Sequence, residues 1–124
     1  MEKITLKNGL RIIFTPLEST KAVTILVLVA VGSKYEKKRI NGLSHLLEHM
    51  IFKGTKKRPK TLDITKELDR VGGMYNAFTG KEFMGYWIKV DSKHFDFSCD
   101  IIADMIFNSL FREEELKKEK INER

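Results

Sequence analysis

The stretch GLSHLLEHMIFKG, residues 42–54, contains two of the three histidines of the chain. Its apolar residues recur at the spacing of one helix face, namely at Leu43, Leu46, Leu47 and Met50. Asn41 or Ser44 can cap such a helix, and Gly54 can end it. We therefore expect one amphipathic helix here. Its histidines are either buried core residues or metal ligands.

The segments on either side of this helix predict further elements, in which strands and helices occur in separate groups along the chain. A hairpin is expected around Asn8-Gly9, the strongest short hairpin signal, and the apolar run AVTILVLVAV, residues 22–31, predicts a buried central strand. The expected elements are strands at about 3–7, 10–15 and 22–31, a helix at about 62–71, two strands within 74–90, a helix within 93–108 and a charged helix from 111 onward. This order predicts an α+β fold in which helices pack on a mostly antiparallel sheet.

The predicted helix within 93–108 has one apolar face and one face of aspartates. We expect Cys99 to be a core residue and the row of Asp96, Asp100 and Asp104 to be the solvated side of the helix. Because Cys99 is the only cysteine, the sequence excludes a disulfide framework and a zinc site of several thiolates.

Length and charge restrict the class of protein. The 124 residues, 42% of them hydrophobic, suffice for one domain with a real core. The formal charge of +6 is concentrated in expected loops, at residues 37–39 and 53–60, without stacking aromatics, so we expect no nucleic-acid partner. The run at 22–31 is too short to cross a bilayer and no secretory signal is visible, so we expect a cytoplasmic protein without membrane contact.

On a helix, the spacing of His45 and His49 lets both imidazoles point at one metal ion. Glu48 lies on the same side and can accept a proton from a water on that metal, which is the arrangement of a hydrolytic zinc site with an inverted H-x-x-E-H motif. Five residues alone leave a buried structural helix equally possible. Catalytic zinc also needs a third protein ligand. His94 has no obvious route to the site, whereas the C-terminal tail offers several glutamates.

Wider sequence context favours the metal site. The stretches GLSHLLEHMIFKGTKKRP, LDRVGGMYNAFTGKEF and ADMIFNSLFREEELKKEK occur in the order found in the N-terminal domain of the M16 (pitrilysin or insulinase-like) zinc peptidases, which include mitochondrial processing peptidase, and the chain resembles that domain over nearly its whole length. The resemblance implies that His45 and His49 bind Zn²⁺ and that Glu48 is the general base. It also implies a fold of the M16/LuxS-like metallohydrolase half.

The resemblance further implies an edge strand that binds an extended peptide, formed by Asn76, Ala77, Phe78 and Thr79. An ordinary exposed strand is the alternative for these residues. For the third zinc ligand we expect Glu123, which lies 74 positions after His49. Glu119, one helical turn earlier, is expected to contact the ligands without binding the metal itself. In an alignment without gaps, the third ligand could instead lie just past Arg124. Glu82 is expected to be a structural residue or a second such partner.

The leading hypothesis is thus a zinc-dependent peptidase domain, residues 1–124, that hydrolyses short or unfolded peptides and ends within its last helix. The alternative is a catalytically silent domain of the same fold that serves as an interaction or assembly module. M16 proteins resemble two halves that close around the substrate, so we also expect a homo-oligomer or a complementary M16-like domain as partner.

Overall fold

The computed structural model describes residues 1–122. Its strands are β1 (Glu2–Thr5), β2 (Arg11–Phe14), β3 (Ala22–Val29), β4 (Met74–Thr79) and β5 (Met84–Asp91). Its α-helices are α1 (Leu43–Ile51), α2 (Thr61–Arg70), α3 (Phe95–Phe107) and α4 (Glu113–Asn122), and three short 3-10 turns lie at Ser33–Tyr35, Lys38–Ile40 and Ser92–His94. The predicted order of elements is therefore confirmed, and the predicted α+β class with it.

Strands β3, β5 and β4 form an antiparallel sheet in that order, so β5 is its central strand. The expectation of a central strand at residues 22–31 is wrong, because among residues 1–122 β3 pairs with β5 alone and lies at the edge of the sheet. It is also not buried throughout: Leu26 and Leu28 point to the exposed face of the sheet. Strand β4 is the opposite edge, paired with β5 from Met74 to Thr79.

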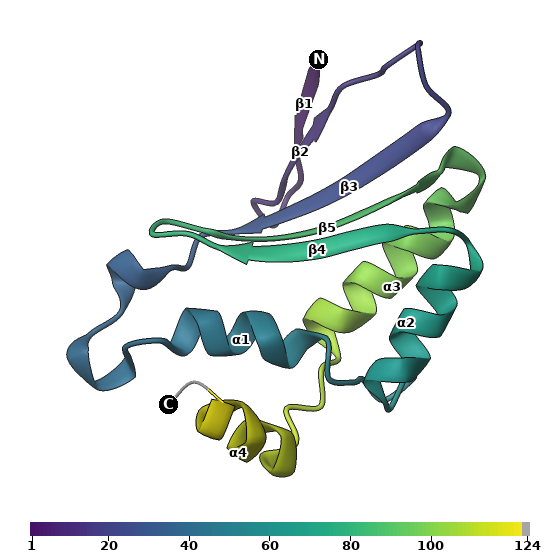
Figure 1. Ribbon diagram of the computed structural model, residues 1–124. Helices are drawn as coiled ribbons and strands as arrows, with labels where there is room; N and C mark the ends of the chain where they lie inside the picture. The colour runs from purple at the N-terminus through teal and green to yellow at the C-terminus, as the bar shows by residue number, and fades with distance from the viewer. Residues whose placement is uncertain (123–124) are drawn as a thin grey trace.

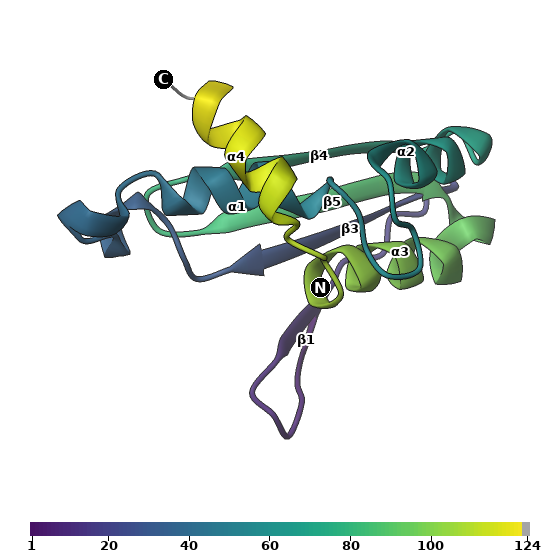
Figure 2. The ribbon, with the colours of Figure 1, turned by 90° about the horizontal axis from the view of Figure 1, so that it is seen from below.

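The helices α1, α2 and α3 all lie on the same side of this sheet, as Figures 1 and 2 show. The core fills the space between the sheet and the helices, where apolar side chains lose their contact with water. Its buried residues include Ile64, Leu68, Met84, Tyr86, Ile88, Ile101 and Met105. Helix α4 lies against α1 on the side away from the sheet (Figure 1).

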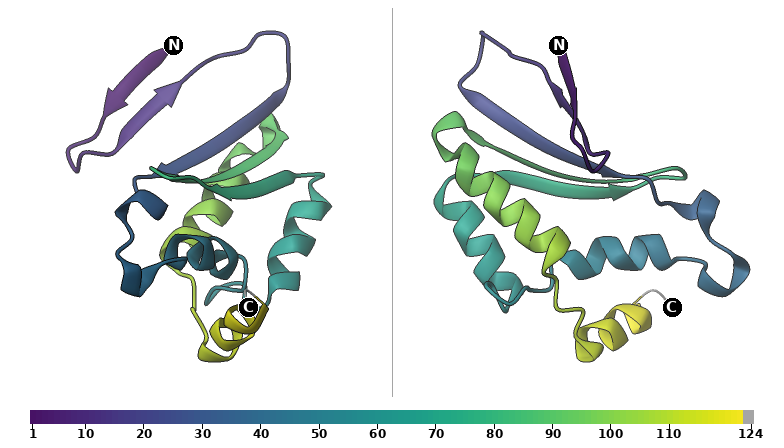
Figure 3. Two further views of the ribbon diagram at one scale, coloured as in Figure 1. Left: turned by 60° about the vertical axis from the view of Figure 1, so that its left-hand side comes forward. Right: turned by 180° about the vertical axis from the view of Figure 1, so that it is seen from behind.

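The hairpin of β1 and β2 stands apart on the other side of the sheet (Figure 3). All eight of its strand residues are exposed, including Ile4, Ile13 and Phe14. None of the described helices has both the length and the apolar character to cross a lipid bilayer.

The N-terminus of helix α1 is capped by the side chain of Glu36, which precedes the helix in the chain. Gly42 is its N-cap residue, with a left-handed φ of 86°, and neither Asn41 nor Ser44 caps it with a side chain. Instead the Glu36 carboxylate accepts hydrogen bonds from the backbone N–H groups of Ser44 and Gly42, both at 2.7 Å. These two bonds hold the pKa of Glu36 below its usual range. The expected local caps are thus replaced by a carboxylate six to eight residues upstream.

An ion-pair network around the buried side chains of Arg58 and Asp104 ties α2 and α3 to the loop after α1. We call it the arginine cluster: Thr55, Arg58, Glu67, Asp100 and Asp104. Arg58 donates to Asp104 at 2.8 Å, to Asp100 at 2.9 Å and to Glu67 at 2.6 Å. Asp104 is buried, so the expectation of a fully solvated aspartate row is wrong at this position. Cys99, expected in the core, is only partly buried.

The segment between α3 and α4 is fastened to the same loop. Thr55 and Ser109 form a β-bridge, and the N–H of Leu110 donates to the carbonyl of Gly54 at 3.0 Å. The Arg112 side chain donates to the carbonyl of Pro59 at 2.6 Å. These contacts place the start of α4 beside the end of α1.

Candidate metal centre

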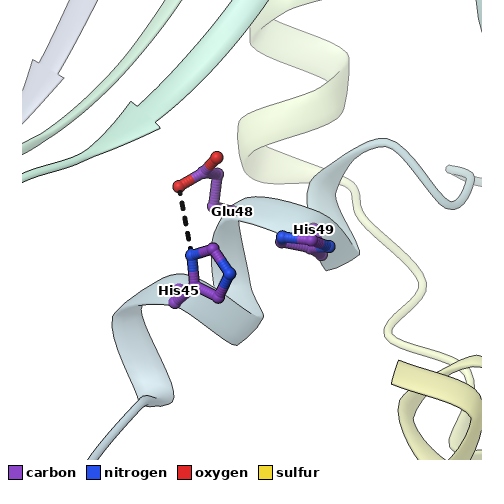
Figure 4. Close-up of side chains that lie close together, drawn as sticks. All are labelled: His45, Glu48 and His49. Carbon is purple, nitrogen blue, oxygen red and sulfur yellow. Dashed lines mark ion pairs between the residues drawn. The ribbon is translucent and has the colours of Figure 1, made fainter. Parts of the chain in front are cut away.

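The side chains of His45, Glu48 and His49 gather on one side of α1 (Figure 4). One ligand atom from each of the three lies within 4.8 Å of the others. The two imidazole rings meet edge to face with their centroids 4.5 Å apart. The helical spacing therefore does what the sequence predicts, since it brings two nitrogen donors and one carboxylate to one place.

The chemistry of these donors fits zinc. Zinc takes imidazole nitrogen and carboxylate oxygen at about 2.0–2.2 Å, so two donors on one ion are at most roughly 4 Å apart. The three groups lie within 4.8 Å of one another, which is close to that spacing. Both histidines remain partly exposed, with 55% of the His45 side chain and 40% of the His49 side chain open to solvent.

Glu48 is held toward strand β4. Its Oε2 accepts a hydrogen bond from the Thr79 hydroxyl at the end of that strand and lies 3.8 Å from His45 Nδ1. The buried Tyr86 lies next to it on the central strand. Burial, with a smaller contribution from the Glu48 charge, raises the pKa of Tyr86 to about 12. Glu48 is thus the carboxylate that joins the helix of the histidines to the sheet.

Glu119 of α4 connects His49 to a lysine. Its Oε2 lies 3.0 Å from His49 Nδ1 and its Oε1 lies 2.9 Å from Lys53 Nζ. The hydrogen bond from Lys53 is the main cause that holds the pKa of Glu119 below its usual range; burial opposes it, and His49 adds to it. Both carboxylate oxygens of Glu119 therefore have partners, so Glu119 contacts the candidate ligand His49 and is not itself placed as a metal ligand. We call His45, Glu48, His49, Lys53 and Glu119 the histidine cluster.

The other predicted site residues lie in different places. Glu123, the expected third ligand, is outside the described residues. Glu82 pairs with Lys34 at 3.2 Å on the exposed β4–β5 hairpin and is not brought to the histidines. His94 lines a separate cavity beside Arg58.

The four residues predicted to bind a peptide are divided between the two faces of β4. Ala77 and Thr79 are partly buried toward the helices, whereas Asn76 and Phe78 are exposed on the other face. A cavity of about 260 Å³ lies between this strand and α1. Its lining residues are Glu48, His49, Phe52, Lys53, Thr61, Asn76, Ala77 and Glu119. Strand β4 at the edge of the sheet therefore shares one cavity with Glu48 and His49.

Two members of this arrangement were missed by the sequence prediction. Lys53 stands four positions after His49, a spacing that could have pointed to it as a neighbour. Thr79 was predicted only as part of the peptide-binding strand, and no local pattern indicates its bond to Glu48, 31 positions away.

The chain matches a known peptidase family and several known proteins in sequence. The family model described as insulinase (peptidase family M16) matches residues 11–124. The chain is 44% identical over 120 residues to the "Uncharacterized zinc protease YmxG" of Bacillus subtilis, covering 97% of this chain and 29% of that protein. It is 39% identical over 115 residues to the mitochondrial-processing peptidase subunit beta of Rattus norvegicus, covering 93% of this chain and 23% of that protein.

A solved structure resembles the fold closely. The crystal structure of a protease from Helicobacter pylori superposes with a TM-score of 0.85 at 35% identity, covering 92% of this chain and 27% of that one. The chain thus spans less than a third of the length of the relatives that it matches.

Proposed function

The chain belongs to the insulinase family of peptidases, M16, and from this premise we propose that it is the zinc-binding, catalytic part of a metallopeptidase. The observation that carries the proposal is the convergence of His45, Glu48 and His49 beside β4, an edge strand of the sheet within the described residues. Relatives named zinc proteases support the choice of metal.

In this proposal the histidines hold the metal and Glu48 moves the proton. Zinc, when bound, lowers the pKa of water toward neutrality and polarises a peptide carbonyl. Glu48 accepts the water proton and passes it to the departing amine. The Thr79 hydroxyl engages Oε2 of Glu48, which leaves Oε1 to receive the proton. His45 and His49 supply the two nitrogen donors, and a third ligand completes the site.

We propose an extended peptide as the substrate. The outer edge of β4 is unpaired within the described residues, so its backbone can bind the backbone of any extended segment, whatever its sequence. The cavity that β4 shares with Glu48 and His49 brings such a segment to the donor group. Short or unfolded peptides fit this mode because a folded chain has its backbone already paired.

The substitution Glu48→Gln tests this function. The variant is expected to keep the zinc content of the unmutated protein, measured by elemental analysis, and to lose at least about a hundredfold in cleavage of a mixed peptide library, because a neutral amide cannot accept the proton. Glu82→Gln is the matched control, since it removes the same charge from a carboxylate paired with Lys34, and it should keep full activity.

Two results would count against the proposal. A protein with stoichiometric zinc that cleaves none of the peptides would favour the silent assembly module of the same family. A Glu48→Gln variant that cleaves as fast as the unmutated protein would remove Glu48 from the chemistry.

The exposed hairpin supports a further protein partner. Ile4, Ile13 and Phe14 expose more than half of their surface on an element that packs little against the sheet, an unusual concentration of apolar surface. We propose that a complementary M16-like domain or a second copy of this chain covers it.

A further inference from the structure

Lys53 lies just beyond the last turn of α1 and reaches across to α4. Its Nζ is 2.9 Å from Oε1 of Glu119 and 3.9 Å from Oε2 of Glu115. The second oxygen of Glu119, Oε2, lies 3.0 Å from Nδ1 of His49. The carboxylate of Glu119 is therefore a bridge with a lysine on one oxygen and a candidate metal ligand on the other.

Burial makes this bridge rigid. Only 9% of the Glu119 side chain is exposed, compared with 30% for Lys53 and 40% for His49. A buried carboxylate that turned away from either partner would lose a charge-assisted hydrogen bond that little water could replace. With a donor on each oxygen, the plane of the carboxylate is fixed, and Oε2 stays directed at His49.

The fold places Lys53 independently of any metal. The next residue, Gly54, has a left-handed φ of 136°, and its carbonyl accepts the N–H of Leu110 at the entrance to α4. The loop that carries Lys53 and the segment that leads to Glu119 are thus fastened to each other before a ligand arrives.

A fixed carboxylate at Nδ1 decides which nitrogen of His49 carries the proton. A carboxylate oxygen can only accept, so Nδ1 must carry the hydrogen, and Nε2 then keeps its lone pair for a metal. Such a carboxylate behind a ligating histidine fixes the ring orientation as well as the tautomer.

We propose that Lys53 is a positioning residue that, through Glu119, keeps His49 in the tautomer with its proton on Nδ1 and Nε2 free. The expected effect of Lys53 on zinc affinity rests on the proposed function, whereas its effect on the tautomer of His49 does not. Nothing in the cluster requires Lys53 to touch the substrate or the metal.

The first test needs no metal. Nitrogen NMR of the histidine rings in the metal-free protein, at a pH where the imidazoles are neutral, should show His49 protonated on Nδ1. Lys53→Met should move His49 toward a mixture of tautomers, and Lys53→Arg should restore the original signal. Lys57→Met is the matched control, because Lys57 stands on the same loop but pairs with Asp100, and it should leave His49 unchanged.

The second test is zinc affinity, measured by competition with a chelating dye. Loss of a residue that hydrogen-bonds a metal ligand weakens metal affinity about 10–100-fold. Lys53 contacts such a residue, Glu119, and not the ligand itself, so Lys53→Met should weaken zinc binding by only roughly 3–10-fold. Lys53→Arg should recover the affinity. Glu115→Gln should bind zinc normally, since Glu115 also contacts Lys53 but not His49. Equal losses in Glu115→Gln and Lys53→Met would show that Lys53 merely fastens α4, and would overturn the proposal.

The two proposals can fail separately. If Lys53→Met changes the tautomer while no variant binds zinc, the positioning role stands and the metal-site proposal fails. If the His49 signal is the same in Lys53→Met as in the unmutated protein, the positioning role is wrong, whatever the zinc affinity.

Discussion

The arginine cluster and the histidine cluster meet at the loop after α1, which carries Thr55 and Arg58 of the first and Lys53 of the second, and they differ in which side chains they leave exposed to solvent. Each contains a nearly buried carboxylate, Asp104 with 7% and Glu119 with 9% of the side chain exposed. In the arginine cluster the cation, Arg58, is also buried, at 4%. In the histidine cluster both imidazoles are partly exposed to solvent, and His49 also lines the cavity beside β4.

This difference separates a structural network from a reactive one. Burial alone would raise the pKa of the Asp104 carboxyl, but hydrogen bonds donated by Thr55, Arg58 and Asn108 outweigh it and lower that pKa. The buried pair of Arg58 and Asp104 holds α3 to the loop after α1, while Glu67 and Asp100 at the edge of the network stay partly exposed. In the histidine cluster the carboxylates are anchored while the histidines keep donor atoms available, which is what a ligand site requires.

Breaking the buried ion pair of the arginine cluster should have the largest effect. Arg58→Met leaves the carboxylates of Asp104, Asp100 and Glu67 without their shared cation. Removing one partner of a buried ion pair costs about 3–5 kcal/mol, so the free energy of unfolding should fall by that amount in urea denaturation. The histidines should gather unchanged in whatever fraction remains folded.

Lys57→Met is the control for this prediction. Lys57 also bonds Asp100, at 2.8 Å, but its side chain is 62% exposed. Exposed pairs contribute about 0–1 kcal/mol. A loss in Arg58→Met no greater than that in Lys57→Met would mean that the arginine cluster does not hold the fold together.

A smaller effect is expected where the histidine cluster meets the sheet. Thr79→Val keeps the shape of the side chain and removes the hydroxyl that binds Glu48. A hydrogen bond to a charged group is worth about 1.5–3 kcal/mol, so kcat for peptide cleavage should fall roughly tenfold or more. Zinc content should be unchanged, and Thr79→Ser should restore most of the rate.

Whether the substitution changes kcat or KM shows which role Thr79 has. If the hydroxyl orients Glu48, the loss lies in kcat; if Thr79 acts only as part of the peptide-binding strand, the loss lies in KM. A Thr79→Val variant with unchanged kcat would show that the bond to Glu48 does not serve catalysis.

Periodic patterns predicted the elements well because the signal is local. The Asn8-Gly9 turn, a helix within residues 42–54 and the strands after Gly73 all follow from spacings of a few residues, although the helix ends at Ile51 and not at Gly54 as expected. The convergence of His45, Glu48 and His49 needed only a helix, and the structure has that helix at Leu43–Ile51. The family was identified from motifs, and the family model confirms it.

Features that depend on distant partners could not be predicted in this way. Asp104 belongs to a row with the spacing of a solvated face, and it is buried only because Thr55 and Arg58, more than forty positions away, supply its donors. An apolar run such as residues 22–31 looks the same in a central strand and in an edge strand, since pairing depends on the other strands. Lys53 meets Glu119 only after the chain has returned through α3.

The smallest expected effect concerns Glu36, whose carboxylate caps the N-terminus of α1, the helix that carries both histidines of the cluster. Its folded pKa is lowered by the backbone N–H groups of Ser44 and Gly42, so its contribution to stability is present above the unfolded pKa, about 4.3. That contribution should disappear as the pH falls through the folded pKa.

Glu36→Gln should therefore be less stable than the unmutated protein at neutral pH, and the two unfolding curves should approach each other in acid. Gln keeps one acceptor oxygen and loses the charge and the second acceptor, so the difference at neutral pH reports the charged double cap. Glu18→Gln, a change of an exposed loop glutamate, is the control for charge alone. A stability difference that persists unchanged at low pH would mean that the ionised carboxylate of Glu36 is not what holds the N-terminus of the histidine-bearing helix.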